Sequence, residues 1–416
     1  MKRQPVITGL GIVSPIGIGV QPFWQSALAG RSGTGPPQLF DSSKLPPDCQ
    51  VVGEVRDFDP RDWMPGASAR MAARFSQFAA AAAKQAVSDS GLKQADIPPD
   101  RIKVSVGTSM SGLVDVQQPT FAAFLRGEDV WPWACLEFPS HAATSHVAIL
   151  NQASGQSTTF GTACAAGLDA VNWAARQVTS GDATAAIAGG TETPLSQYSL
   201  MAFHRVGVLS KWAGPPSEAS RPFDRLRDGL VLAEGAAIVV VEDEADARAR
   251  GAHIYARVLG FGSATEGAHL RKVDESGQTV ARSFELALRD AGLTISDIDF
   301  VSAHGNGMRD YDVAETAGIK AVFNRHAWSI PISSLKSMCG QSLAAGGPMQ
   351  VVAACLTLRD QIISPTINLT SPDPACDLDY VPTRARKARV RNVLIHSHSL
   401  GGSHVAMILG SPDYSS

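Results

Sequence analysis

The sequence predicts an α/β fold built from two similar halves. Short apolar runs typical of buried strands alternate with helical patterns, from residue 6 to residue 409. The chain has 416 residues, more than one core usually holds, and 44% of them are hydrophobic while 18% are charged. Alternating strands and helices favour parallel sheets covered by helices. We expect an N-terminal half over residues 1–250 and a C-terminal half over residues 251–416.

The first half begins with a predicted buried strand, Val6–Val13, and a helix that ends at Gly30. Proline, glycine and polar residues over 31–66 indicate a surface loop. An alanine-rich stretch then predicts one long helix over 67–90, closed by Gly91. The other elements expected in this half are strands at 102–106, 157–160, 185–188 and 236–241 and helices at 120–125, 140–150 and 168–177.

The second half repeats this rhythm without a sequence repeat. Its expected strands are 255–259, 300–303, 393–398 and 405–409, and its expected helices are 280–290, 312–322 and 342–358. Layered α/β architecture in both halves follows from this alternation.

Cys164 lies where a predicted strand passes through a turn of small residues into a helix. The N–H groups and the positive dipole at the start of a helix favour a thiolate, which is the nucleophilic form of cysteine. Small neighbours on both sides give a substrate carbonyl room to approach. The alternative interpretation is a buried cysteine that only packs as a small hydrophobic residue.

Composition excludes several classes of function. The net charge is −3 and no run of basic residues occurs, so neither nucleic acid nor an anionic membrane is expected as a partner. The six cysteines form no CxxC pair, so neither a metal site nor a disulfide framework is predicted. No apolar run is long enough for a membrane span and no secretory signal is apparent. The expected location is the reducing cytoplasm.

Polar residues also gather in three later stretches at expected strand ends: AHGNGM (303–308), SSLKSMCGQ (333–341) and HSHSLGG (396–402). Together with Cys164, their order resembles the β-ketoacyl synthases of fatty-acid and polyketide biosynthesis, members of the thiolase superfamily. The resemblance covers nearly the whole chain. Its other segments are VITGLG (6–11), SPIG (14–17), FW (23–24), AGRSG (29–33), TACA (162–165), GGTE (189–192), RPFD (221–224), EG (234–235) and SPTIN (364–368).

The resemblance implies a thiolase-like αβαβα layered fold of two similar halves and a set of site residues. Cys164 would take an acyl group from the phosphopantetheine of an acyl carrier protein, and no other cofactor is implied. Backbone amides of Cys164 and Leu400 would form the oxyanion hole. A malonyl-type donor would then lose carbon dioxide and attack the thioester, a step for which the family uses two histidines, a lysine and a glutamate. His304, Lys336 and Glu315 fall on the first histidine, the lysine and the glutamate.

The second histidine of the family is replaced by Gln341, five residues after Lys336. A glutamine amide donates a hydrogen bond to an enolate oxygen, but it carries neither a positive charge nor a transferable proton. Losing a charge-assisted donor costs roughly a few kcal/mol, or about two to three decades in rate. Three functions therefore stay open: a condensing synthase, an acyltransferase that forms no carbon–carbon bond, and a partner subunit resembling a chain-length factor.

Further departures concern the carrier arm and the closing loop. Arg271, Asn306 and Met308 stand where relatives present hydroxyl residues to pantetheine, which indicates either drift or a changed carrier or donor. His398 and Leu400 occupy gate positions at which the family usually has phenylalanines. Leu400 is expected to widen or loosen the gate, and His398 either packs there or supplies the missing imidazole. The implied partners are an acyl carrier protein and a second subunit, in a homodimer or in a heterodimer with a homologous chain.

Overall fold

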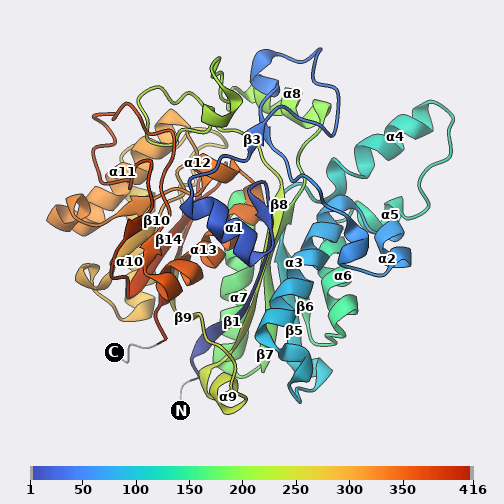
Figure 1. The fold of residues 1–416 in the computed structure, drawn as a ribbon, viewed down its shortest axis with the longest axis horizontal. Helices are drawn as coiled ribbons and strands as arrows, with labels where there is room; N and C mark the ends of the chain where they lie inside the picture. Colours follow the sequence, from blue (N-terminus) through green and yellow to red (C-terminus); the bar gives the residue numbers. More distant parts are fainter. Residues whose placement is uncertain (1–2, 413–416) are drawn as a thin grey trace.

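The computed structural model describes residues 3–412 and has five layers, α–β–α–β–α (Figure 1). The central helices are α7 (Ala166–Ser180) and α13 (Gly346–Asp360). On one side, α3 (Arg74–Ser90) and α6 (Ala142–Asn151) cover the sheet of the first half. On the other side, α10 (Gln278–Ala291) and α11 (Arg309–Phe323) cover the sheet of the second half. The predicted thiolase-like layered fold of two halves is confirmed.

Most strands of the first half are buried, because helices cover both faces of their sheet, whereas the edge strand β6 (Ser157–Phe160) is partly exposed. Within it β5 pairs with β6 and β7 in parallel, whereas β8 is antiparallel to both β7 and β1. The expectation of parallel sheets therefore holds for β5, β6 and β7 but not for β8 and β1. These strands are β1 (Pro5–Ser14), β5 (Ile102–Gly107), β6 (Ser157–Phe160), β7 (Ala185–Glu192) and β8 (Gly235–Asp243).

The second half has the same mixture of directions. Its strand β10 is parallel to β11 and β14, and β15 is antiparallel to β14 and β9. The connection between β14 and β15 spans only residues 399–402, and so short a loop can join only antiparallel neighbours. These strands are β9 (Ala256–Thr265), β10 (Phe300–Ser302), β11 (Ile332–Ser333), β14 (Asn392–His398) and β15 (Ser403–Gly410).

The alanine-rich stretch 67–90 does not form the single helix that was predicted. It is divided into α2 (Gly66–Met71) and α3, with Ala72 in extended conformation between them. The backbone N–H of Ala73 donates to a carboxylate oxygen of Glu137 at 2.9 Å. A tertiary contact therefore satisfies an N–H group that a continuous helix would have used internally, and helix propensity is overridden.

Of the remaining helices, α1 and α4 follow the predicted pattern, whereas α5, α8, α9 and α12 were not anticipated. No helix among residues 3–412 is long and apolar enough to cross a membrane. These helices are α1 (Val20–Leu28), α4 (Gln117–Leu125), α5 (Ala134–Glu137), α8 (Gln197–Val206), α9 (Glu244–Ala249) and α12 (Lys336–Cys339).

The two central helices begin with the same backbone motif, which relates the two halves although their sequences do not repeat. Each helix has 15 residues and follows directly on a three-residue 3-10 turn. The first residue of each turn has a positive φ, 52° at Ala163 and 45° at Leu343. Cys164 is the second residue of the first turn, and Ala344 is the second residue of the other. Of these two equivalent turns, therefore, only the first carries a thiol.

Candidate active site

Cys164 is buried at the start of α7, and the loop after β14 fixes the turn around it. The hydroxyl of Ser399 accepts a hydrogen bond from the N–H of Ala165 and donates one to the carbonyl of Thr162, both at 2.9 Å. The hydroxyl of Ser397 donates to the carbonyl of Cys164 at 3.0 Å. The turn that carries the thiol is thus held by side chains that come from the other half of the molecule.

Burial raises the pKa of the Cys164 thiol to about 12. The positive charge of Lys336 and the backbone N–H groups of Leu400 and Cys164 act in the opposite direction but do not outweigh it. The expectation that the start of the helix would favour a thiolate is therefore wrong for the free protein. Removal of water from the thiol outweighs the helix dipole and the amides.

The two backbone amides expected to form an oxyanion hole both approach the sulfur of Cys164. The N–H groups of Leu400 and Cys164 lie close enough to lower the thiol pKa by hydrogen bonding. Among residues 3–412 no oxygen accepts a hydrogen bond from the N–H of Leu400. That donor is therefore free to bind a substrate oxygen beside the sulfur.

His304 follows β10 and is 2% exposed. Burial lowers the pKa of its imidazole well below the usual value, and the charge of Lys336 lowers it further, so the ring is neutral. Its Nδ1 accepts a hydrogen bond from the backbone N–H of His398 at 3.1 Å. The neutral ring therefore carries its proton on Nε2, where it serves as a donor. Asn306 Nδ2 lies 3.3 Å from this Nε2 and, being a donor itself, cannot accept that proton.

Lys336 and Glu315 hold the segment around His304. Lys336 Nζ donates to the carbonyl of His304 at 2.8 Å, and Glu315 accepts the backbone N–H of His304 at 2.7 Å. Burial lowers the pKa of Lys336 to about 8, although the charge of Glu315 opposes that shift. Burial alone would raise the pKa of Glu315, but the contact with His396 outweighs it and leaves that pKa below its usual value.

Gln341 directs its side-chain amide to the nucleophile. Its Nε2 lies 3.5 Å from the sulfur of Cys164, and its Oε1 is buried without a hydrogen-bond partner within residues 3–412. The backbone of Gln341 is held by hydrogen bonds to Val231 and Ala233 at 2.7 and 2.9 Å. A rigid backbone therefore places one N–H donor and one unused acceptor next to Cys164.

Two of the three residues expected to contact the carrier arm lie together. Arg271 and Met308 line a pocket of about 490 Å³, and Met308 also belongs to the buried apolar cluster that contains Cys164. The pocket therefore adjoins the apolar surroundings of the thiol. Asn306 does not line it, because its side chain is buried beside His304.

The two expected gate residues have different surroundings. Leu400 is partly buried against the apolar cluster around Cys164. His398 is fully buried, and its ring stacks on Tyr311 with ring centroids 4.2 Å apart. The hydrogen bond from His398 to His304 comes from the backbone, not from the ring. Stacking against Tyr311 matches the packing alternative for His398 more closely than a replacement imidazole.

Two family models match the chain: the N-terminal domain of β-ketoacyl synthases over residues 3–247 and the C-terminal domain over residues 255–370. The chain belongs to the β-ketoacyl synthase family. It is 38% identical over 409 residues to 3-oxoacyl-(acyl-carrier-protein) synthase 2 of Coxiella burnetii, and the alignment covers 98% of both chains. It is 37% identical over 422 residues to the ketoacyl synthase alpha subunit of the tetracenomycin polyketide synthase from Streptomyces glaucescens, covering 99% of this chain and 98% of that one.

Solved structures give the same family. One is a type II polyketide ketosynthase in complex with its acyl-carrier protein and bound to a hexaketide, which matches with a TM-score of 0.92 and 32% identity over 99% of this chain and all of that one. Another is the ishigamide ketosynthase/chain length factor, with a TM-score of 0.91 and 33% identity over 100% of both chains.

Sequence reasoning missed several residues that support the active site of this β-ketoacyl synthase. Gln350 accepts from Lys336 Nζ at 3.2 Å and donates to the carbonyl of Ala303 at 2.9 Å, which ties α13 to the segment of His304. His396 binds Glu315, and Ser399 braces the Cys164 turn. The polar run HSHSLGG (396–402) was the available signal for His396 and Ser399. Gln350 gave no signal because it lies within an apolar helix.

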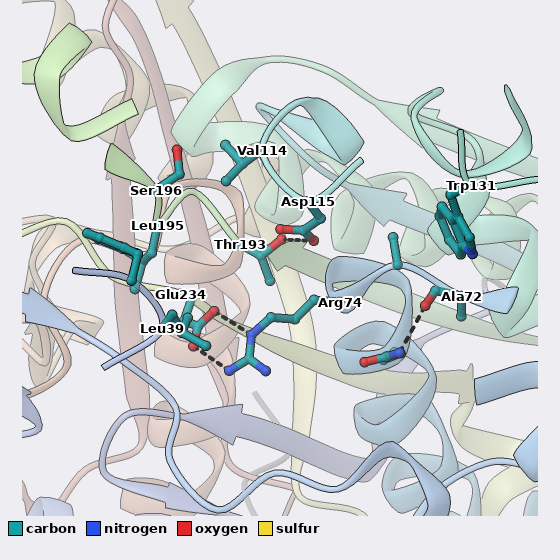
Figure 2. A pocket seen from close by; sticks show the side chains of 13 residues that line it. Leu39, Ala72, Arg74, Val114, Asp115, Trp131, Thr193, Leu195, Ser196 and Glu234 are labelled. Carbon is teal, nitrogen blue, oxygen red and sulfur yellow. Dashed lines mark hydrogen bonds and ion pairs between the residues drawn. The ribbon is translucent and has the colours of Figure 1, made fainter. Parts of the chain in front are cut away.

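A separate pocket of about 460 Å³ lies beside the start of α3 and does not contain Cys164. Figure 2 shows Arg74 and Glu234 facing each other across it, with Asp115 next to Thr193. The ion pair between Arg74 and Glu234 measures 2.7 Å, so neither charge is free for a ligand. Asp115 accepts hydrogen bonds from the hydroxyl of Thr193 and from the backbone of Phe75. The charged groups of this pocket therefore bind other groups of the protein, and these contacts hold the start of α3 in place.

The free energy of unfolding of the natural protein is expected to fall as the pH rises through the pKa of Asp115, and Asp115→Asn should abolish this fall. Burial raises the pKa of Asp115 to about 7, so the folded state binds its proton more tightly than the unfolded state. Stability is therefore lost as the pH rises from about 4 to about 7. Urea unfolding at pH 5 and pH 8 should show the variant gaining about 1–3 kcal/mol relative to the natural protein at the higher pH. The exposed Asp129→Asn is the control, and equal pH dependence of all three proteins would refute the assignment.

Proposed function

We propose that this protein is a condensing β-ketoacyl synthase that forms an acyl-enzyme on Cys164. The observation that carries the proposal is the set of N–H donors around one buried sulfur. The backbone amides of Leu400 and Cys164 approach Sγ, and the amide of Gln341 lies 3.5 Å from it. Donors at this position stabilise the negative oxygen that develops when a thioester carbonyl is attacked.

In the first step, the sulfur of Cys164 attacks the thioester carbonyl of an acyl group carried on phosphopantetheine. The carbonyl oxygen becomes an oxyanion bound by the amides of Leu400 and Cys164. The proton of the Cys164 thiol passes to the departing pantetheine sulfur, which leaves as the free thiol. Covalent capture divides the acyl transfer into two easier steps.

In the second step, a malonyl-type thioester loses carbon dioxide and keeps the electron pair as an enolate. His304 Nε2–H and the amide of Gln341 donate hydrogen bonds to the enolate oxygen. The enolate carbon attacks the Cys164 thioester and expels the thiolate. Neutral donors suffice for this role because they bind the enolate oxygen without transferring a proton to it.

The proposed partners are an acyl carrier protein and a second synthase subunit. We place the phosphopantetheine arm in the pocket of Arg271 and Met308, which adjoins the apolar surroundings of the thiol.

Strand β6 ends the sheet and leaves an unpaired edge on which a second subunit can add a strand. The segment that precedes β6 in the sequence also exposes apolar side chains, at Phe121, Phe124, Leu125, Leu136 and Phe138. A second copy of this chain or a homologous subunit can pair with this edge, so both a homodimer and a heterodimer are compatible with it.

Because all six cysteines are unpaired, we place the protein in a reducing compartment such as the cytoplasm.

The test of this function is a product analysis. The protein is mixed with an acyl-carrier protein and a malonyl-carrier protein, and both carriers are weighed by intact mass spectrometry. A condensing synthase yields a 3-oxoacyl carrier. An acyltransferase without condensation yields acyl exchange but no 3-oxoacyl product, and a partner subunit without catalysis yields neither. Either of these last two outcomes would overturn the proposal.

Gln341→His is expected to change the condensation rate by less than about tenfold. Burial keeps the His304 imidazole neutral, and an imidazole at the buried position 341 would be neutral for the same reason, so the substitution exchanges one neutral donor for another and restores no charge-assisted hydrogen bond. Gln341→Ala removes that donor and should lower the rate by about tenfold to a hundredfold. Both rates are measured as 3-oxoacyl carrier formed per minute. A gain of more than about a hundredfold in Gln341→His would mean that the natural residue suppresses decarboxylation, contrary to the proposal.

A further inference from the structure

A second group of histidines lies at the same end of the sheet of the second half. His398 and His404 are directly opposite each other on the antiparallel strands β14 and β15. Glu266 follows β9, which pairs with the other side of β15. One nitrogen from each imidazole and one oxygen of the carboxylate all lie within 4.8 Å of one another. Three adjacent strands therefore bring two imidazoles and a carboxylate together.

The hydrogen bonds within this group are incomplete. Nε2 of His404 pairs with Glu266 Oε1 at 2.8 Å. His398 Nε2 and His404 Nδ1, however, are buried and have no hydrogen-bond partner among residues 3–412. Both side chains are at most 1% exposed. Buried polar atoms nearly always have a partner, so the bare Nε2 of His398, next to the His404 and Glu266 pair, points to a missing ligand.

We infer that Glu266, His398 and His404 form a binding site for a divalent transition-metal ion, with Zn²⁺ as the probe. Two imidazoles and a carboxylate are a common zinc ligand set that leaves a fourth position open. Metal–ligand bonds of about 2.0–2.2 Å place ligand atoms about 3.3–3.5 Å apart around a tetrahedral ion. The three ligand atoms already lie within 4.8 Å of one another, so side-chain rotations can bring them to these separations.

The site is joined to the loop that covers Cys164. The backbone N–H of Glu266 donates to the carbonyl of Gly402 at 2.9 Å, and Gly401 donates to Leu270 at 2.7 Å. His398 precedes this loop and His404 follows it, so a metal ion would fix both of its ends to β9. The site goes beyond the proposed condensation, because metal binding requires neither an acyl group nor a carrier.

The experiment is a calorimetric titration of Zn²⁺ into the Cys164→Ala protein, which lacks the nucleophilic thiol as a competing ligand. We expect one ion per chain and an affinity more than about tenfold weaker in His398→Phe and in His404→Asn. His398→Phe is the cleaner variant, because Nε2 of His398 has no hydrogen-bond partner among the described residues that the substitution would remove. Circular dichroism confirms that each variant is folded.

The matched control is His204→Asn, which disrupts the other candidate cluster, Asp48, Cys49 and His204, and is expected to leave the affinity unchanged. Co²⁺ in place of Zn²⁺ should give a visible spectrum without a thiolate-to-metal band, since no thiol belongs to the proposed ligand set. Three results would overturn the inference: absence of saturable binding, unchanged binding in His398→Phe and His404→Asn, or loss of binding in His204→Asn. None of these results depends on whether the protein condenses acyl groups.

Discussion

Cys164→Ala is expected to abolish acyl-enzyme formation and, with it, all 3-oxoacyl product. The sulfur is the atom that attacks the acyl thioester, and the backbone N–H groups of Leu400 and Cys164 both act on it. The alanine variant should keep the fold, because Cys164 occupies a small buried space within a turn held by Ser399. Intact mass spectrometry after exposure to an acyl-carrier protein should show the acyl adduct on the natural protein and none on the variant.

The matched control for this experiment is Cys135→Ala, which removes an exposed thiol outside the proposed site. Its adduct should equal that of the natural protein. Persistence of the adduct in Cys164→Ala together with its loss in Cys135→Ala would show that acylation is a surface reaction. The assignment of Cys164 as nucleophile would then be wrong.

His304→Ala is expected to lower the condensation rate by about a hundredfold to a thousandfold while leaving the acyl-enzyme intact. The Nδ1 atom of His304 is engaged by the backbone of His398, so Nε2–H is the donor available to the enolate oxygen. The loss is larger than for Gln341 because removal of the ring also leaves the buried backbone N–H of His398 without its acceptor. Acyl-enzyme is followed by mass, and condensation by the 3-oxoacyl carrier.

His304→Gln tests whether the ring of His304 acts only as a hydrogen-bond donor or also transfers a proton. A glutamine amide at this position supplies a neutral donor like that of Gln341, and the rate should recover to within about tenfold of the natural protein. If His304→Gln is as slow as His304→Ala, the ring must transfer a proton and not only donate a hydrogen bond. If neither variant changes the rate, His304 has no part in condensation.

The layered fold and most elements could be predicted from the sequence, because apolar periodicity and glycine punctuation are local signals. The division between α2 and α3 could not, since it depends on Glu137, which lies far from Ala73 in the sequence. Strand direction was also mispredicted. Helices between strands suggested parallel pairing throughout, whereas β8 and β15 pair antiparallel with both of their neighbours.

The candidate site residues could be proposed as a set because each occupies a motif whose order along the chain is recognisable. Their electrostatics were not predictable, since the pKa of the Cys164 thiol depends on how completely the surrounding layers exclude water. The pairing of Lys336 with Gln350 and the cluster of Glu266, His398 and His404 also appear only in three dimensions. Those contacts join segments that are separated along the chain and have no shared local pattern.

The central claim is that Cys164 supports decarboxylative condensation although Gln341 replaces an imidazole. The most direct test starts from isolated acyl-enzyme, adds malonyl-carrier protein, and measures carbon dioxide and 3-oxoacyl carrier in a single turnover. We expect one carbon dioxide and one 3-oxoacyl product for each acyl group lost from Cys164. Loss of the acyl group to another thiol without release of carbon dioxide would contradict the claim.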